Sequence, residues 1–124
     1  EEKLEGGDTR VVLRLPAALA PVKLAILPLV KKDGLPEKAR EIMNELRFYF
    51  RCAYEEKDSI GKRYRRQDAI GTPYCITVDH ETLTDGCVTI RHRDTMEQER
   101  VSIDSLRSII EEKVSLTSLL RQLK

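Results

Sequence analysis

The chain has 124 residues and a mass of 14.3 kDa, a size typical of one domain with a single core. Lysine and arginine number 22 against 21 acidic residues, so the net charge of +1 excludes a polycation that coats nucleic acid without selectivity. Hydrophobic residues at 40% and charged residues at 35% exclude disorder throughout and predict a soluble domain. We expect neither a membrane span nor secretion, because no run reaches ~20 apolar residues and no signal-peptide pattern is evident.

The N-terminal third predicts a linker followed by a buried strand. Residues 1–10 carry four acids and two bases around a Gly-Gly pair without an apolar period, which indicates a linker or the cut end of a longer chain. We therefore place the domain at residues 11–124. After a short apolar stretch closed by Pro21, Val22–Val30 is a nearly continuous hydrophobic run, typical of a strand buried on both faces.

The middle of the chain alternates helix and strand signals. Apolar residues recur every three or four positions over Pro36–Phe50 and predict an amphipathic helix, followed by a short strand over Cys52–Glu55. A second helix runs to Ile70, where Gly71 ends it, and either Asp58 or Ser59 caps its start. This order of elements predicts an α/β domain.

Three further strands are expected over Tyr74–Asp79, Cys87–Arg93 and Glu97–Ile103, with a turn at Asp85-Gly86. Their alternation puts Val88 and Ile90 in the core and leaves the opposite face wet. From Asp104 onward the apolar spacing predicts a C-terminal helix with a kink or break near Ser115.

The residues point to no reaction centre. Cys52, Cys75 and Cys87 form no C-x-x-C pair, which disfavours a disulfide framework and a zinc site and favours reduced thiols in the cytoplasm. A small enzyme that pairs Cys75 or Cys87 with His80 or His92 is an alternative, but no recognisable catalytic motif supports it. We therefore predict no catalytic residues and no metal ligands.

A basic run on the second predicted helix is the first candidate for RNA binding. Lys62, Arg63, Arg65 and Arg66 surround Tyr64 and provide charges that can contact a phosphate backbone, while the tyrosine can stack on a base. The alternative is a solvated helix surface with Tyr64 packed inward.

Two arginines on a strand are the second candidate. Arg91 and Arg93 leave the same face of the sheet, so their guanidinium groups can donate to the edges of unpaired bases. The alternative is an ordinary exposed strand that pairs these arginines with Asp94 or Glu99.

Three separated segments resemble a known family. Leu19–Leu29, Ser59–Pro73 and Arg93–Gln98 are similar, in order and spacing, to the C-terminal anticodon-binding domain of the dimeric class II glycyl-tRNA synthetases. The resemblance extends from about Thr9 to the C-terminus. It implies a mixed, mostly five-stranded sheet flanked by about three helices.

The resemblance also implies a function. The domain is expected to bind the anticodon arm of tRNA(Gly), within a cytoplasmic homodimer that binds no membrane and no DNA. In the family the catalytic domain, which uses ATP and Mg to activate glycine, precedes this domain. This chain has none of that domain's motifs, so we expect the fragment to need no cofactor and to be non-catalytic.

Site roles follow by analogy with the threonyl relatives. A glycine anticodon ends in CC, and arginine can donate to cytosine N3 and O2 while a carboxylate accepts from N4. The resemblance assigns Arg91 and Arg93 as donors, Asp79 or Glu81 as the acceptor, and Asp94 to the same anticodon site. The chain departs from the usual family residues in having Ala69 for Glu, His80 for an aromatic residue, Glu81 for Asp and His92 for Asp.

Two other assignments share this architecture. One is an interaction module like the accessory subunits of mitochondrial DNA polymerase, and the other is the equivalent domain of a threonyl, prolyl or histidyl synthetase. Short turns at Asp33-Gly34 and Asp85-Gly86, together with the Arg-x-Arg-Asp string at 91–94, favour a synthetase over the accessory subunit.

Overall fold

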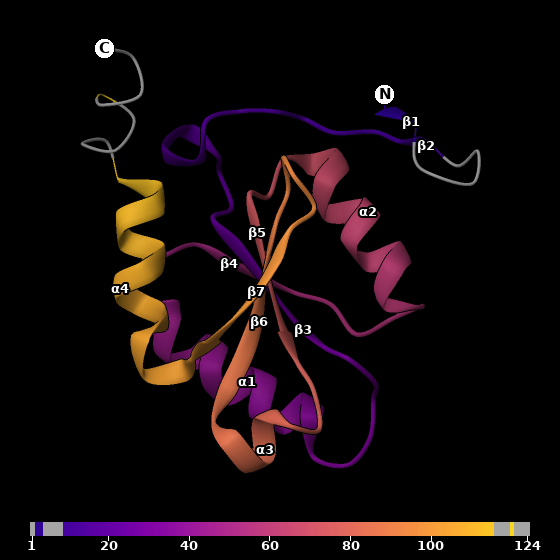
Figure 1. The fold of residues 1–124 in the computed structure, drawn as a ribbon, viewed down its shortest axis with the longest axis vertical. Coiled ribbons are helices and arrows are strands. Elements are labelled where there is room, and N and C mark those ends of the chain that lie inside the picture. Colours follow the sequence, from indigo (N-terminus) through magenta and orange to yellow (C-terminus); the bar gives the residue numbers. More distant parts are fainter. Residues whose placement is uncertain (1, 4–8, 116–119, 121–124) are drawn as a thin grey trace.

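A computed structural model describes residues 2–3, 9–115 and 120, and its centre is a mixed five-stranded sheet in the order β4-β3-β5-β6-β7 (Figure 1). The strands are β3 (Leu24–Pro28), β4 (Cys52–Tyr54), β5 (Tyr74–Val78), β6 (Cys87–His92) and β7 (Gln98–Ser102). Strands β4, β3 and β5 are parallel, while β5, β6 and β7 are antiparallel. The predicted α/β class and the mixed five-stranded sheet are confirmed.

The helices are α1 (Leu35–Leu46), α2 (Ile60–Ile70), the four-residue α3 (Thr82–Asp85) and α4 (Ile103–Val114), with a 3₁₀ turn η2 at Ala17–Leu19. A separate pair joins β1 (Glu2–Lys3) to β2 (Thr9–Arg10). The sequence predicted α1, α2 and α4 and read α3 only as a turn. None of the helices in the described ranges is long and apolar enough to cross a membrane.

Helix boundaries follow the predicted capping residues. The Ser59 hydroxyl accepts a hydrogen bond from the Lys62 amide at 3.3 Å, and Gly71 ends α2 with φ +87°, a left-handed conformation that glycine adopts without strain. Helix α4 ends at Ser115, where the sequence predicted a kink or break. The leucines predicted to continue this helix lie outside the described residues, apart from Leu120.

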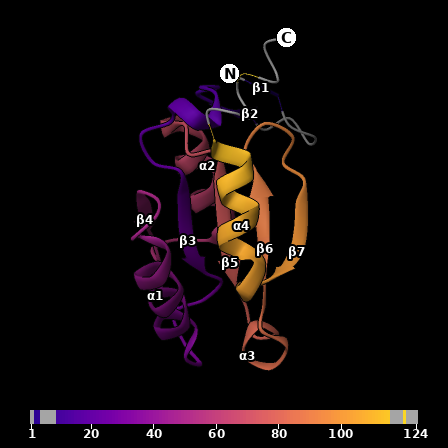
Figure 2. The ribbon, with the colours of Figure 1, turned by 90° about the vertical axis from the view of Figure 1, so that its left-hand side faces the viewer.

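One face of the sheet carries the main core. Helices α1 and α4 cover this face, as Figure 2 shows. Strands β3, β5 and β6 contribute Leu24, Ile26, Ile76, Val78, Val88 and Ile90, all fully buried. Their alternation is the one the sequence predicted for β6, so the identity of the core face is confirmed.

The opposite face is covered in part by α2 (Figure 1). Ile60 and Tyr64 of this helix pack on Ala25, Leu27 and Cys75. The predicted wet face of β5 is wrong here, because Cys75 and its face neighbour Thr77 are buried beneath α2. The far half of the same face, over β6 and β7, bears exposed side chains at Gln98 and Arg100.

Candidate nucleic-acid interface

Arg91, the first predicted base-reading arginine, lies inside the domain. Its residue is 5% exposed, and its Nη1 and Nη2 atoms donate to the two carboxylate oxygens of Asp68 at 2.8 and 3.0 Å. Burial alone would lower the pKa of Arg91, but the hydrogen bonds to Asp68 outweigh it and the pKa is raised. The predicted exposure of Arg91 is wrong because the C-terminal half of α2 lies over this part of β6.

Arg93 is also buried, and it fastens three segments together. Its Nη1 donates to the Gly71 carbonyl at 2.9 Å, its Nη2 to the Leu15 carbonyl at 2.6 Å, and its Nε to Asp94 at 2.8 Å. The Asp94 carboxylate is exposed, and the hydrogen bond from Arg93 lowers its pKa. Arg93 therefore positions Asp94 and does not reach solvent itself.

The end of the predicted linker belongs to the same buried group. The Arg10 Nη1 donates to Asp68 at 2.9 Å and to the Arg93 carbonyl at 2.7 Å. Asp68 is fully buried, and its carboxylate forms ion pairs with the guanidinium groups of both Arg10 and Arg91. Arg10 lies in the segment predicted as a linker, and its side chain is buried against the domain. We call Arg10, Asp68, Arg91 and Arg93 the Asp68 cluster.

Two of the four basic residues of α2 are committed to the fold. Arg63 is buried and donates to the carbonyls of Pro28 at 2.6 Å and Leu29 at 3.0 Å. Arg66 donates to the Glu55 carboxylate at 2.7 Å. Both side chains connect α2 to the loops that follow β3 and β4. The predicted contact of Arg63 with an RNA backbone conflicts with the burial of its side chain.

The other two basic residues face outward. Lys62 and Arg65, three positions apart, are exposed on the outer surface of α2. The pKa of Asp58, at the start of this helix, is lowered chiefly by a hydrogen bond from Arg66 and further by the charges of Lys62 and Lys31. Cationic side chains therefore gather where α2 begins, beside the loop that follows β3.

A second charged group lies on the uncovered half of the α2 face. Arg100 of β7 donates to both oxygens of Asp79, at 3.0 and 3.3 Å, and to both oxygens of Asp85, at 3.1 to 3.3 Å. The Glu81 carboxylate lies 3.9 Å from the same guanidinium. We call Asp79, Glu81, Asp85 and Arg100 the Arg100 cluster.

The Arg100 cluster is ordered and reachable from solvent. Asp79 also accepts from the amide and hydroxyl of Thr82, at 3.0 and 3.1 Å. Side-chain exposure is 30% for Arg100, 43% for Asp85 and 78% for Glu81. The hydrogen bonds raise the pKa of Arg100 and lower that of Asp85, so the cluster presents ionised acceptors at neutral pH.

The sequence indicated Asp79 and Glu81 as candidates and did not indicate Arg100, which contacts both. The alternation of side chains along β7 could have indicated Arg100. This residue pairs with Thr89 across the β6–β7 hairpin, so both side chains lie on the face of the sheet opposite to the main core. Strand β7 is polar along most of its length, which hid that alternation.

Of the four residues that depart from the family pattern, Glu81 lies in the Arg100 cluster and the other three lie elsewhere. The His80 Nε2 atom forms a hydrogen bond with the Asp33 carboxylate at 2.9 Å, which connects the loops that follow the parallel strands β3 and β5. His92, at the end of β6, packs edge-on against Tyr74 with ring centroids 5.4 Å apart. Ala69 is exposed on α2.

Burial disfavours the ionised form of two of the three cysteine thiols. All three cysteines are free, and burial raises the pKa of Cys75 to about 12 and that of Cys52 to about 11, which disfavours the thiolate. No group of three or more His, Cys, Asp or Glu side chains within these residues is placed to hold a metal ion.

The fold and the charged groups together define the class of the protein. A mixed sheet with helices on both faces, with charged side chains on the face that α2 covers in part, is an α/β domain of two helical layers around one sheet. Residues 23–113 match the anticodon binding domain family, and the chain belongs to that family.

Individual relatives agree with this membership. The chain is 61% identical over 115 residues to the glycine–tRNA ligase of Clostridium perfringens, covering 90% of this chain and 24% of that protein. It is 57% identical over 109 residues to the glycine–tRNA ligase of Borrelia hermsii, covering 88% and 24%. A crystal structure of the RNA binding domain of threonyl-tRNA synthetase from Cryptosporidium parvum superposes with a TM-score of 0.73 at 25% identity, covering 81% of this chain and 25% of that one. The chain thus spans about a quarter of the length of these relatives.

Proposed function

We propose that this chain is the anticodon-binding domain of a glycine–tRNA ligase and binds the anticodon arm of tRNA(Gly). The identity of 57% and 61% to two glycine–tRNA ligases carries the proposal. The 25% identity to the threonyl domain makes the threonyl alternative the weaker one. In this proposal the ATP- and Mg-dependent activation of glycine belongs to the part of the ligase outside this chain, and the ligase is a cytoplasmic homodimer.

We assign base reading to the carboxylates of the Arg100 cluster. Cytosine presents an amino donor at N4, and an ionised carboxylate is the matching acceptor. Asp79 and Glu81 are the acceptors, and Arg100 positions Asp79. Asp94, also exposed, remains a candidate at the other end of β6. Arg91 and Arg93 support this face from inside the domain, in place of the donor role that the sequence indicated.

Backbone contacts are assigned to the outer surface of α2. Lys62 and Arg65 are exposed there, and cations that displace counterions from phosphates supply affinity without sequence preference. The surface and the Arg100 cluster lie on the same side of the sheet.

Binding to short RNAs tests the proposal. The chain should bind a tRNA(Gly) anticodon stem-loop more tightly than stem-loops with a changed second or third anticodon letter, by about 1 to 3 kcal/mol per letter at fixed salt. Equal affinity for all of them would contradict anticodon reading. The chain alone should show no glycine-dependent exchange of pyrophosphate into ATP.

A further inference from the structure

The chain crosses the end of α2 and the β6–β7 turn before it enters the sheet, and we call residues 9–15 of this stretch the entry segment. The entry segment lies outside residues 23–113, which match the anticodon binding domain family, so family membership assigns it no role. After β2 its residues form no helix or strand, so individual hydrogen bonds hold it against the domain. These bonds show which part of the domain the entry segment positions.

Arg10 anchors the start of the entry segment inside the domain. This residue is 3% exposed. Besides its bonds to Asp68 and to the Arg93 carbonyl, its Nη2 donates to the Asp94 carbonyl at 3.5 Å. Three positions further on, the Leu13 amide donates to the Asp68 carbonyl at 2.9 Å. The entry segment is therefore fixed to the C-terminal end of α2 and to the residues that follow β6.

Arg14 anchors the entry segment a second time, at the same turn. Its Nη1 donates to the Asp94 carboxylate at 3.0 Å and to the Asp94 carbonyl at 3.2 Å. A bond also runs in the opposite direction, because the Arg93 Nη2 donates to the Leu15 carbonyl at 2.6 Å. The entry segment and the β6–β7 turn thus hold each other in place.

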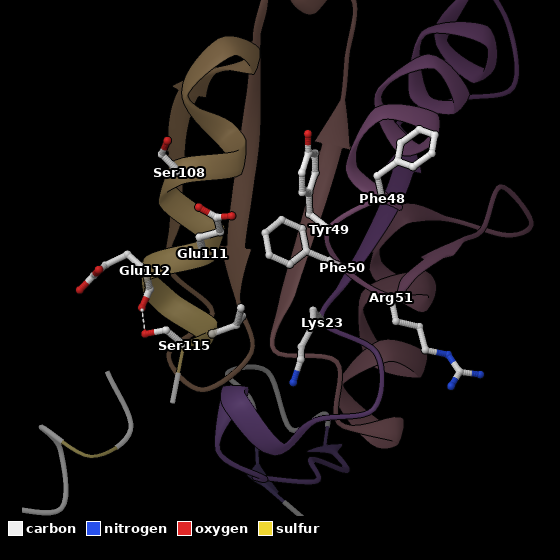
Figure 3. Close-up of a pocket in the computed structure, with 10 residues that line it drawn as sticks. Lys23, Phe48, Tyr49, Phe50, Arg51, Ser108, Glu111, Glu112 and Ser115 are labelled. Atoms are coloured by element: carbon white, nitrogen blue, oxygen red, sulfur yellow. Dashed lines mark hydrogen bonds between the residues drawn. The ribbon is translucent and has the colours of Figure 1, made fainter. Parts of the chain in front are cut away.

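The chain beyond the entry segment is fixed as well. Lys23, directly before β3, donates from its Nζ to the carbonyls of Ala17 and Ala18, at 3.0 and 2.8 Å. Figure 3 shows this side chain pointing toward the 3₁₀ turn η2. Ala20, which follows that turn, is buried. With contacts on both sides of it, Arg14 is held over the turn that carries Asp94.

The Asp94 carboxylate is held in one orientation and yet remains accessible. Its Oδ1 accepts from both Arg14, at 3.0 Å, and the Arg93 Nε, at 2.8 Å, while its Oδ2 accepts from the Arg93 Nη2 at 3.2 Å. The side chain of Asp94 is 53% exposed. A carboxylate has about four acceptor positions, so Asp94 can accept a further hydrogen bond from a base.

We propose that Arg14 is a positioning residue for RNA recognition, which fixes the Asp94 carboxylate where an unpaired base can reach it. The inference rests on the proposed function in one respect, that Asp94 lies in the anticodon site. Exposed ion pairs contribute little to stability, so Arg14 orients an acceptor rather than maintaining the fold. The recognition unit then includes the entry segment and is longer than the part of the chain that matches the family.

A double-mutant cycle on the 124-residue chain tests this role. Titrations with the tRNA(Gly) anticodon stem-loop, and with stem-loops changed at the second or third letter, give the preference of each variant for the CC anticodon. Asp94→Asn should lower this preference about tenfold. Arg14→Gln should lower it about threefold, and the double variant should lose no more than Asp94→Asn alone. Arg107→Gln, which removes an exposed arginine paired with Glu111 on α4, should leave the preference unchanged.

The pKa of Asp94 provides a second measurement, which needs no RNA. The hydrogen bond from Arg93 lowers this pKa most, and the charge and hydrogen bond of Arg14 lower it further. The pKa of Asp94 should therefore be higher in Arg14→Gln than in the wild type, and unchanged in Arg107→Gln. An NMR titration of the side-chain carboxyl carbons measures it, and the circular dichroism spectra of the variants verify that they are folded.

Other outcomes overturn the positioning role. Additive losses in the double variant, with a salt slope lower by roughly one in Arg14→Gln, identify Arg14 as a phosphate contact. An unchanged pKa of Asp94 in Arg14→Gln shows that Arg14 does not hold the carboxylate. Unchanged preference in Asp94→Asn overturns the inference and leaves the proposed function standing. If the wild type does not discriminate between stem-loops, the proposed function fails, and a raised pKa in Arg14→Gln still supports the orientation of Asp94 by Arg14.

Discussion

The Asp68 cluster and the Arg100 cluster pair the same chemical groups on the same side of the sheet, but only one is closed to solvent. Arg91 pairs with Gln98 across the β6–β7 hairpin, and Arg100 pairs with Thr89, the next residue of β6 on that face. The Asp68 side chain is fully buried, whereas Asp85 is 43% exposed. The end of α2 and the segment that contains Arg10 make this difference. Cover by other elements, rather than residue type, separates the buried Asp68 cluster from the solvent-accessible Arg100 cluster.

The two environments give the ion pairs different energetic consequences. Removing one partner of a buried pair leaves an uncompensated charge in a medium that solvates it poorly. Around Arg100, water can replace a lost partner, so a substitution there costs little stability. The charged groups of the Arg100 cluster remain accessible to a ligand because no other element in the described part of the chain covers them.

The largest expected effect is on stability, from Asp68→Asn. The substitution leaves Arg10 and Arg91 buried without their carboxylate, so the free energy of unfolding should fall by about 3 to 5 kcal/mol. Urea unfolding followed by circular dichroism measures it. Asp58→Asn, at an exposed partner of Arg66 on the same side of the sheet, is the matched control and should change little. Equal shifts in the two variants would mean that burial does not set the cost of losing the Asp68 carboxylate.

The next effect is on RNA discrimination, from Asp79→Asn. The amide oxygen can retain the Thr82 contacts, but the charged acceptor for cytosine N4 is lost. Preference for the CC anticodon should fall by about 1 to 3 kcal/mol in stem-loop titrations, with the fold intact.

Glu99→Gln provides the matched control for Asp79→Asn. Glu99 is adjacent to Arg100 on β7 but pairs with Ile90 and so belongs to the opposite face. The Glu99→Gln variant has the same change in charge as Asp79→Asn and should leave the preference for the CC anticodon unaltered. A loss of discrimination in both variants would indicate net charge, rather than a specific acceptor, as the cause.

The sequence predicted most of the fold because its signals are local. The continuous apolar run predicted β3, the three-and-four spacing predicted α1, and Ser59 and Gly71 marked the ends of α2. Each of these depends on residues close together in the chain, where periodicity and capping chemistry act.

The candidate site was less predictable because cover is a long-range property. Alternation in β6 showed that Arg91 faces away from the core, but it cannot show that a helix lies over that face. The partners Arg10 and Asp68 are 58 positions apart, and Asp68 and Arg91 are 23 apart. No local pattern links them, so an interior ion pair and an exposed RNA-binding arginine have the same sequence signature.

A smaller effect is expected from Lys62→Ala, which removes an exposed cation from α2. If Lys62 contacts a phosphate, binding should weaken equally for all stem-loops, and the slope of log affinity against log salt should decrease by roughly one. Lys38→Ala on α1, across the sheet, is the control and should leave the slope unchanged. An unchanged slope for Lys62→Ala would leave this residue as part of a solvated helix surface.

The smallest expected effect is the acid response of the Arg100 cluster. Partial burial would raise the pKa of Asp79, but hydrogen bonds from Arg100 and Thr82 outweigh it and the pKa lies below 3.8. The pKa of Asp85 is lowered chiefly by Arg100. Carboxylates with a lower pKa in the folded state stabilise the fold above their unfolded pKa, near 3.9, and this contribution is lost as the pH falls through the folded value.

The variant Arg100→Gln separates this contribution from general acid denaturation. Without the guanidinium, Asp79 and Asp85 titrate closer to their unfolded values, so the variant has less stability to lose on acidification. Melting temperatures of the wild type and of Arg100→Gln should therefore differ most near neutral pH and converge as the pH falls below the unfolded pKa and through the lowered folded values. Arg107→Gln removes an exposed Arg–Glu pair on α4 and keeps the Arg100 cluster intact, so its acid response should follow that of the wild type. A constant offset between the wild type and Arg100→Gln down to acid pH would show that Arg100 does not hold these carboxylates ionised. The cluster would then lack the ordered acceptors that set it apart from other exposed charges on the sheet.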